Sequence, residues 1–322
     1  PNADKVQFGD YSITKNNEYG VTVLEGIRNN AGKNITVNYA LGCGITSLST
    51  DGIAEAVEVA RKSDVVVLVL GGTSMPLSGI GWGDENSKEP NTCGEGYDRS
   101  ELDFPGVQPQ LFEKIAETGK PIVLVMINGR PLTIGKEAAK ASALLEAWYP
   151  GEKGGEAVAR ILFGDVNPSG RLSVTFPPTT GHIPMYANHK PSAKGYYNQP
   201  GSPEQTGRDY VFSAPKPLFC FGYGLSYTTF EYSDLKIENN LKQGGKCVDV
   251  YCAVTNTGSR DGAEVVQLYV RDVFSSVTTP VKSLKAFEKV YLKKGETKVV
   301  HLTIAEDDLK LWNQDMKHVL EP

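Results

Sequence analysis

Residues 65–104 read VVVLVLGGTSMPLSGIGWGDENSKEPNTCGEGYDRSELDF, and their character changes twice. The run from Val65 to Leu70 is apolar and β-branched, which is typical of a parallel strand buried on both faces. Gly71 and Gly72 end this run, and a long polar loop leads to Glu95-Gly96-Tyr97-Asp98-Arg99. Loops of this length inside compact domains are usually functional, and ligands of open α/β sheets bind at the carboxyl ends of strands. The stretch therefore predicts an α/β sheet with a functional loop at one strand end.

Strand and helix patterns alternate around this stretch. The apolar spacing predicts helices over residues 51–62, 105–118, 134–141 and 156–163, and strands over 35–41, 65–70, 121–127, 143–148 and 174–176. Residues 1–34 are polar and turn-rich, with only short apolar pieces. Alternating strands and helices indicate a mostly parallel sheet with helices on both faces.

The second half of the chain has a different pattern. Residues 177–217 are dense in Pro, Gly, Asn, Tyr and Ser, which indicates an extended connection, and an aromatic cluster, FCFGYGLSYTTF, follows at 219–230. Short strands are then predicted at 230–237, 247–255, 263–270, 284–290, 298–304 and 309–312. We expect an α/β domain over residues 1–200, a connecting segment with an aromatic junction over 201–229, and an immunoglobulin-like all-β sandwich over 230–322.

Composition excludes several classes of protein. The net charge is −5 and no long run of Lys or Arg occurs, which argues against nucleic acid and against an anionic membrane surface as partners. No apolar run approaches the length of a membrane span. Five scattered cysteines without a CxxC spacing, and four histidines without a ligand pattern, indicate neither a disulfide framework nor a zinc site.

Four motifs carry a resemblance to a known family. They are CGEGYDRSELDFPGVQ, NGRPL, AWYPGEKGGEAVARILFGDVNPSGRLSVTFP and PLFCFGYGLSYTTFEYSDL, in this order along the chain. Together they resemble glycoside hydrolase family three, in its β-glucosidase and β-xylosidase branch. The resemblance implies an α/β sandwich (a mostly parallel sheet flanked by helices) followed by a fibronectin type III-like sandwich.

The resemblance also implies a part that this sequence does not match. In the family an N-terminal (β/α) barrel carries the nucleophilic aspartate, and neither the barrel nor its motif is found here. Residues 1–4 resemble the middle of the first strand of the family's sandwich, and the last strand expected of the fibronectin-like domain is not found. We expect the C-terminal part of a longer enzyme, inactive alone.

Glu95 matches the family's acid/base position within GEGYDR. Retaining glycosidases need two carboxyl groups roughly 5–5.5 Å apart, one as the nucleophile and the other as the acid/base. A glutamate between Gly94 and Gly96 can swing its carboxyl over a barrel mouth. The alternative is that Glu95 is an ordinary solvated loop charge.

Further site candidates flank Glu95. Asp98 and Arg99 either contact sugar or form an ion pair that anchors the loop to the next helix, and we favour the ion pair. Trp82, Asp84 and Glu85 are candidates for lining the aglycone side, since an indole can stack on a sugar face. The turn from Gly71 to Ser74 lacks the GxGxxG spacing, which argues against a nucleotide site.

The function predicted from the sequence is the C-terminal part of a retaining, exo-acting β-glycosidase. β-Glucosidase is the first hypothesis, β-xylosidase or α-arabinofuranosidase the second, and a non-catalytic carbohydrate-binding scaffold the rival from another class. The expected partners are a β-linked oligosaccharide or glucoside and the N-terminal barrel, with a homodimer left open. No cofactor is implied, and the resemblance indicates a secreted or periplasmic protein.

Overall fold

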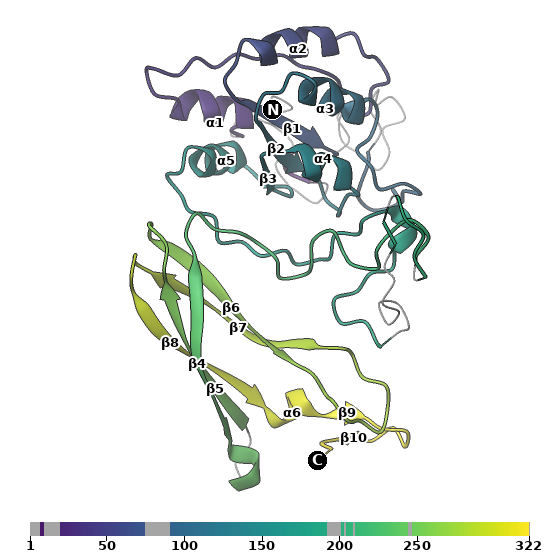
Figure 1. Cartoon of the computed structure of the whole chain (residues 1–322), viewed down its shortest axis with the longest axis vertical. Helices are drawn as coiled ribbons and strands as arrows, with labels where there is room; N and C mark the ends of the chain where they lie inside the picture. The colour runs from purple at the N-terminus through teal and green to yellow at the C-terminus, as the bar shows by residue number, and fades with distance from the viewer. Residues whose placement is uncertain are drawn as a thin grey trace. The chain divides into compact units, whose positions relative to one another are not determined.

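The computed structural model describes residues 7–9, 20–74, 91–191, 201–202, 204–208, 210–243 and 247–321 (Figure 1). The chain divides into two compact units. The first holds the described residues up to Val166 together with Pro177–Ile183, and the second holds Asn167–Phe176 and the described residues from Pro184 onward. Residues 167–176 thus belong to the second unit, although they lie inside the range 1–200 predicted for the first domain.

The first unit is built on a three-stranded parallel sheet in the order β1-β2-β3. Its strands are β1 (Val66–Gly71), β2 (Ile122–Ile127) and β3 (Ala143–Glu146). Val66 pairs with Ile122, and Val123 pairs with Ala143, so the three carboxyl ends meet at one edge of the sheet. The parallel sheet predicted from the apolar runs is confirmed.

Two of the predicted strands are wrong. Residues 35–41 form no strand, and both Ile35 (49% exposed) and Leu41 (63% exposed) face solvent. Residues 174–176 form only one isolated bridge, between Phe176 and Phe219 of the second unit. Alternating apolar residues fit a strand, but a strand forms only where a neighbouring strand supplies hydrogen-bond partners.

Five α-helices of the first unit surround this sheet (Figure 1). The sequence predicted α2 (Ile53–Arg61), α3 (Gln108–Ala116), α4 (Gly135–Lys140) and α5 (Gly154–Leu162), with boundaries displaced by up to three residues. Helix α1 (Val23–Asn30) lies in the stretch that was interpreted as turn-rich, and that interpretation was wrong.

A capping box explains the missed helix. The Thr22 hydroxyl accepts from the N–H of Glu25 at 3.2 Å, and the Glu25 carboxylate accepts from the N–H of Thr22 at 2.8 Å. The spacing Thr-x-x-Glu before apolar residues is a recognised signature of a helix start. The sequence therefore carries the signal for this helix start.

The two faces of the sheet are covered by different helices. Val23 of α1 and Val158 of α5 pack in one core cluster with Val125 and Ile127 of β2. Because side chains alternate along a strand, Leu124 and Met126 point to the other face. Neither of these two side chains is exposed, and α3 buries three apolar residues, Leu111, Phe112 and Ile115.

The core of the second unit is built from two antiparallel sheets. One has the order β4-β5-β8, from β4 (Phe230–Asn239), β5 (Cys247–Asn256) and β8 (Thr297–Ala305), and the other pairs β6 (Gly262–Val270) with β7 (Ser283–Leu292). The buried core draws from both sheets: Val254, Val266, Val290, Leu292, Val300 and Leu302. Short β9 (Leu311–Trp312) and β10 (His318–Val319) pair near the end, after α6 (Glu306–Leu309). The predicted β-sandwich is confirmed.

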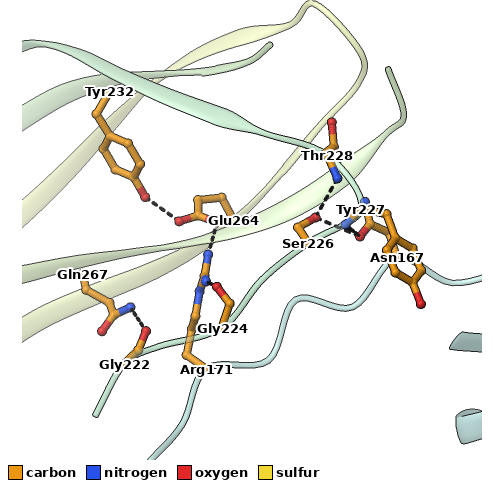
Figure 2. A network of polar contacts seen from close by, with 10 residues as sticks. All are labelled: Asn167, Arg171, Gly222, Gly224, Ser226, Tyr227, Thr228, Tyr232, Glu264 and Gln267. Atoms are coloured by element: carbon orange, nitrogen blue, oxygen red, sulfur yellow. Dashed lines mark hydrogen bonds and ion pairs between the residues drawn. The ribbon is translucent and has the colours of Figure 1, made fainter. Parts of the chain in front are cut away.

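A network of polar contacts joins residues 167–171 to this sandwich (Figure 2). The Arg171 guanidinium forms an ion pair with Glu264 of β6 and also donates to the carbonyl of Gly224. The Tyr232 hydroxyl of β4 donates to the same Glu264 carboxylate at 2.7 Å. Burial, and then the bond to Glu264, raise the pKa of Tyr232. These contacts explain why residues 167–176 belong with the β-sandwich.

Candidate active site

Strand β1 leads into Gly71 and Gly72, two positions where the structure leaves no room for a side chain. Gly71 has φ +147°, and a Cβ there would lie 1.9 Å from the carbonyl oxygen of Ile127. The buried Gln108 side chain accepts from the N–H of Gly71 and donates to its carbonyl, both at 2.8 Å. The backbone leaves the sheet here in one defined direction.

The far end of the long loop returns to this strand end. The N–H of Thr73 donates to the Thr92 hydroxyl at 2.9 Å, and the N–H of Thr92 donates back to the carbonyl of Thr73 at 2.8 Å. Thr73 is fully buried, and a Cβ at Gly72 would lie 2.1 Å from Oγ1 of Thr92. Residues 73 and 92 therefore clamp the two ends of the loop together.

Glu95 lies on a turn three residues after this clamp. It stands between Gly94 (φ +115°) and Gly96 (φ +78°), and the N–H of Tyr97 donates to the carbonyl of Gly94 at 3.2 Å. Glu95 is exposed, and the site of a Cβ on Gly96 is open space. The turn presents a carboxyl group to solvent just beyond a rigid anchor.

Two of the other predicted site residues, Asp98 and Arg99, follow Glu95 in the described part of the chain. Asp98 is exposed, and the Arg99 guanidinium donates to the carbonyl of Asp103 at 2.7 Å. Arg99 thereby ties the loop to the segment before α3, while the sugar-contact and ion-pair hypotheses for Asp98 and Arg99 both stay predictions. Trp82, Asp84 and Glu85 lie outside the described residues.

A second turn, which sequence reasoning did not assign to the site, supports the loop. It is Asn128-Gly129-Arg130, directly after β2. The Arg130 guanidinium donates to the carbonyl of Tyr97 at 2.8 Å, and the Asn128 amide donates to the carbonyl of Arg130 at 2.6 Å. Burial, and then the charge of Arg130, lower the pKa of Arg99. A polar turn that follows a buried parallel strand was the signal available in the sequence.

A buried carboxyl lies at the end of the third strand. Glu146 is the last residue of β3, and its Oε1 accepts from the N–H of Trp148 at 2.9 Å. Trp148 has φ +51°, a conformation that is uncommon for a large side chain. Burial raises the pKa of Glu146 to about 8, against the hydrogen bonds from Trp148 and Asn128, which lower it.

The carboxyl ends of β1, β2 and β3 thus support one polar site. It offers an exposed carboxyl on a defined turn, which can give or take a proton, above a layer of buried polar side chains. Within the described ranges no group of three or more His, Cys, Asp or Glu side chains could hold a metal ion, and no helix there is long and apolar enough to cross a membrane.

Comparison with family profiles gives two matches. Residues 1–227 match the glycosyl hydrolase family 3 C-terminal domain, and residues 264–322 match a fibronectin type III-like domain.

Curated relatives are similar over nearly the whole chain. A β-xylosidase of Formosa agariphila is 43% identical over 94% of this chain and 39% of its own length. A periplasmic β-glucosidase of Salmonella typhimurium is 39% identical over 98% of this chain and 41% of its own length. The chain thus spans about two fifths of the length of these relatives.

Solved structures give the same result. A β-glucosidase of Listeria innocua in complex with isofagomine superposes with a TM-score of 0.81 at 34% identity, over 99% of this chain and 41% of that one. A β-glucosidase of Erythrobacter marinus superposes with a TM-score of 0.80 at 36% identity, over 100% of this chain and 43% of that one.

Proposed function

Because the chain belongs to glycosyl hydrolase family 3, of which it carries the C-terminal domain followed by a fibronectin type III-like domain, we propose that it is the C-terminal part of a retaining, exo-acting β-glycosidase. Relatives named as β-glucosidases and β-xylosidases support this activity. We propose β-glucosidase as the first activity and β-xylosidase or α-arabinofuranosidase as the second.

Glu95 is proposed as the general acid/base, and one observation carries this role. Its carboxyl stands exposed on a turn between two positive-φ glycines, three residues after the clamp formed by Thr73 and Thr92. A retaining glycosidase needs a second carboxyl roughly 5–5.5 Å away as the nucleophile. We propose that an N-terminal barrel supplies this nucleophile and that docking of the barrel brings it beside Glu95.

The first test replaces Glu95 with alanine in the full-length enzyme. General acid catalysis contributes roughly 10²–10⁴-fold where the leaving group needs a proton. We expect kcat/KM for a methyl glycoside to fall by about this factor, and kcat/KM for a 2,4-dinitrophenyl glycoside, whose leaving group needs no proton, to change little. Azide should restore turnover of the covalent intermediate, because an anionic nucleophile needs no general base.

Equal losses on both glycosides, or activity close to that of the unmodified enzyme, would overturn the role of Glu95. Glu101→Ala is the matched control, since Glu101 is another exposed glutamate of the same segment. The sugar specificity is tested separately with aryl β-glucosides, β-xylosides and α-arabinofuranosides on the intact enzyme.

Asp98 and Arg99 are proposed to support sugar binding from beside Glu95, and Trp82, Asp84 and Glu85 to line the aglycone side. For Arg99 the support is the hydrogen bond to the carbonyl of Asp103, which holds its guanidinium within the segment that follows Glu95. Substitution of a residue that binds the aglycone should raise KM for disaccharides more than for aryl monosaccharides.

Export to the periplasm or the medium is proposed on the relative named as periplasmic. Fractionation of cells that express the intact protein tests it. A homodimer is tested by the mass of the intact enzyme in solution.

A further inference from the structure

Two buried side-chain oxygen atoms without hydrogen-bond partners in the described part of the chain lie near the carboxyl ends of β2 and β3. Glu146 pairs in register with Met126, two residues before Asn128. Oε2 of Glu146 and Oδ1 of Asn128 are both buried, and neither has a hydrogen-bond partner among the residues that the structure describes. The Asn128 side chain lies near the Glu146 carboxyl, and donation from its amide lowers the pKa of Glu146, but burial raises that pKa by more.

The charge state of Glu146 decides whether these two oxygen atoms can form a hydrogen bond. An ionised carboxylate is an acceptor only, and a buried acceptor without a donor costs free energy. A proton on Glu146 turns one carboxyl oxygen into a donor, while Oε1 still accepts from the N–H of Trp148. The burial that raises the pKa of Glu146 to about 8 acts in the same direction.

From this carboxyl, contacts lead to both sides of Glu95. The Asn128 amide holds the carbonyl of Arg130, whose guanidinium holds the carbonyl of Tyr97. On the other side, a Cβ at Gly129 would lie 2.7 Å from Sγ of Cys93 and 2.5 Å from the Tyr149 ring. The turn 128–130 therefore supports the chain two residues before and two residues after Glu95.

We propose that Glu146 is a positioning residue, which in its neutral form holds the turn 128–130 and thereby the loop that carries Glu95. This proposal rests on the acid/base role proposed for Glu95. Glu146 makes no contact with the reacting atoms and acts through Asn128 and Arg130.

Other ionisable groups lie along the turn 128–130. Arg130 belongs to the turn that it supports, Arg99 lies near Arg130, and the Cys93 thiol and Tyr149 phenol lie at Gly129. Among the described residues, no charged side chain contributes to the pKa shift of Glu146. Ionisation of Glu146 itself is therefore the event that the tests address.

The kinetic test uses Glu146→Gln and Glu146→Ala in the full-length enzyme. Glutamine keeps one acceptor and one donor, as the neutral acid does, whereas alanine keeps neither. We expect alanine to lower kcat/KM for a methyl glycoside by up to about 10²-fold, the typical effect of a misplaced catalytic group. For the 2,4-dinitrophenyl glycoside, which does not need Glu95 as an acid, kcat/KM should change by less than about threefold. Glutamine should resemble the unmodified enzyme on both.

Glu95→Ala and Glu156→Gln, measured in parallel, separate the possible failures. Glu156 is an exposed glutamate of α5 and should leave both substrates unaffected. If Glu95→Ala shows the expected selectivity and Glu146→Ala does not, only the positioning role is overturned. If Glu95→Ala lacks the selectivity, the proposed function fails. If Glu146→Gln lowers kcat/KM as much as Glu146→Ala, the proposal that Glu146 acts in its neutral form is overturned.

A second measurement does not depend on catalysis. A carboxyl with a pKa of about 8 in the folded enzyme and about 4.3 in the unfolded chain favours folding while it is protonated. This contribution is complete below pH ~4.3 and is lost as the pH rises through about 8. The Tm of Glu146→Gln minus that of the unmodified enzyme should therefore increase between these pH values and stay constant above them. A Tm difference that does not change with pH would overturn the proposal that Glu146 is neutral in the folded enzyme.

Discussion

Glu264 and Glu146 have opposite surroundings. Glu264 lies in the β-sandwich with the Arg171 guanidinium and the Tyr232 hydroxyl as partners. Glu146 lies in the α/β unit, where its carboxyl accepts from the N–H of Trp148 and lies near the Asn128 amide. The first environment supplies a counter-charge and a hydrogen-bond donor, whereas burial in the second raises the pKa of Glu146. The same residue type thus serves as the centre of an ion-pair network in one unit and as a proposed neutral support in the other.

Removal of Arg171 tests the network of Glu264. Arg171→Met leaves a buried carboxylate without its counter-charge, which typically costs 3–5 kcal/mol, about as much as the loss of a whole core residue. We expect the free energy of unfolding of the full-length enzyme to fall by about this amount in urea titrations. Tyr232→Phe, which removes one hydrogen bond to a charged group, should cost about 1.5–3 kcal/mol.

Arg61→Met is the control for this experiment. Arg61 pairs with Glu58 on α2, and their side chains are 61% and 57% exposed, so its removal should cost less than about 1 kcal/mol. Equal effects of the two arginine substitutions would contradict a structural role for the buried pair.

At the scale of elements, the first unit depends on a close crossing of α1 and α5. The N–H of Gly155 donates to the carbonyl of Val21 at 3.0 Å, immediately before α1. A Cβ at Gly155 would lie 2.1 Å from the carbonyl oxygen of Thr22, and one at Gly26 would lie 2.1 Å from the carbonyl oxygen of Gly155. Backbone contacts backbone here, which is why this crossing requires glycine on both sides.

Gly155→Ala should therefore separate α1 from α5. Overpacking usually costs 1–3 kcal/mol, and a clash with backbone, which cannot rotate away, belongs at the upper end, at about 3 kcal/mol. Thermal unfolding of the full-length enzyme, followed by circular dichroism, measures the effect. Gly135→Ala at the start of α4 is the control, because its Cβ would meet open space. A Gly155→Ala variant as stable as Gly135→Ala would contradict this packing.

At the scale of the whole molecule, the chain is proposed to carry one carboxyl of a catalytic pair. Residues 1–322 alone should therefore bind to or dock against a barrel domain but hydrolyse no β-glycoside, even one with an activated leaving group. The measurement compares the rate of hydrolysis of a 2,4-dinitrophenyl glycoside by this chain with the rate by the full-length enzyme. Circular dichroism checks that the chain alone is folded. Hydrolysis by the chain alone that disappears in Glu95→Ala would contradict the proposed origin of the nucleophile.

The elements that the sequence predicted are those whose pattern is local. The apolar runs of β1 and β2 and the stripe of α2 appear at the expected positions, with ends displaced by at most two residues. The loop with Glu95 was also found from the sequence, because the GEGYDR motif is contiguous. The errors at 35–41 and 174–176 arose because an alternating pattern does not reveal whether a partner strand exists.

By itself, the sequence determined the order of the two units, the parallel and antiparallel character of their sheets and the glutamate of the candidate site, since each depends on neighbouring residues. Only the tertiary structure revealed that Arg130 holds the carbonyl of Tyr97, two residues after that glutamate, and that Arg171 belongs with Glu264, 93 positions away. The physical reason is burial: a polar side chain is satisfied by whichever group folding brings beside it, and spacing along the chain does not record that neighbour.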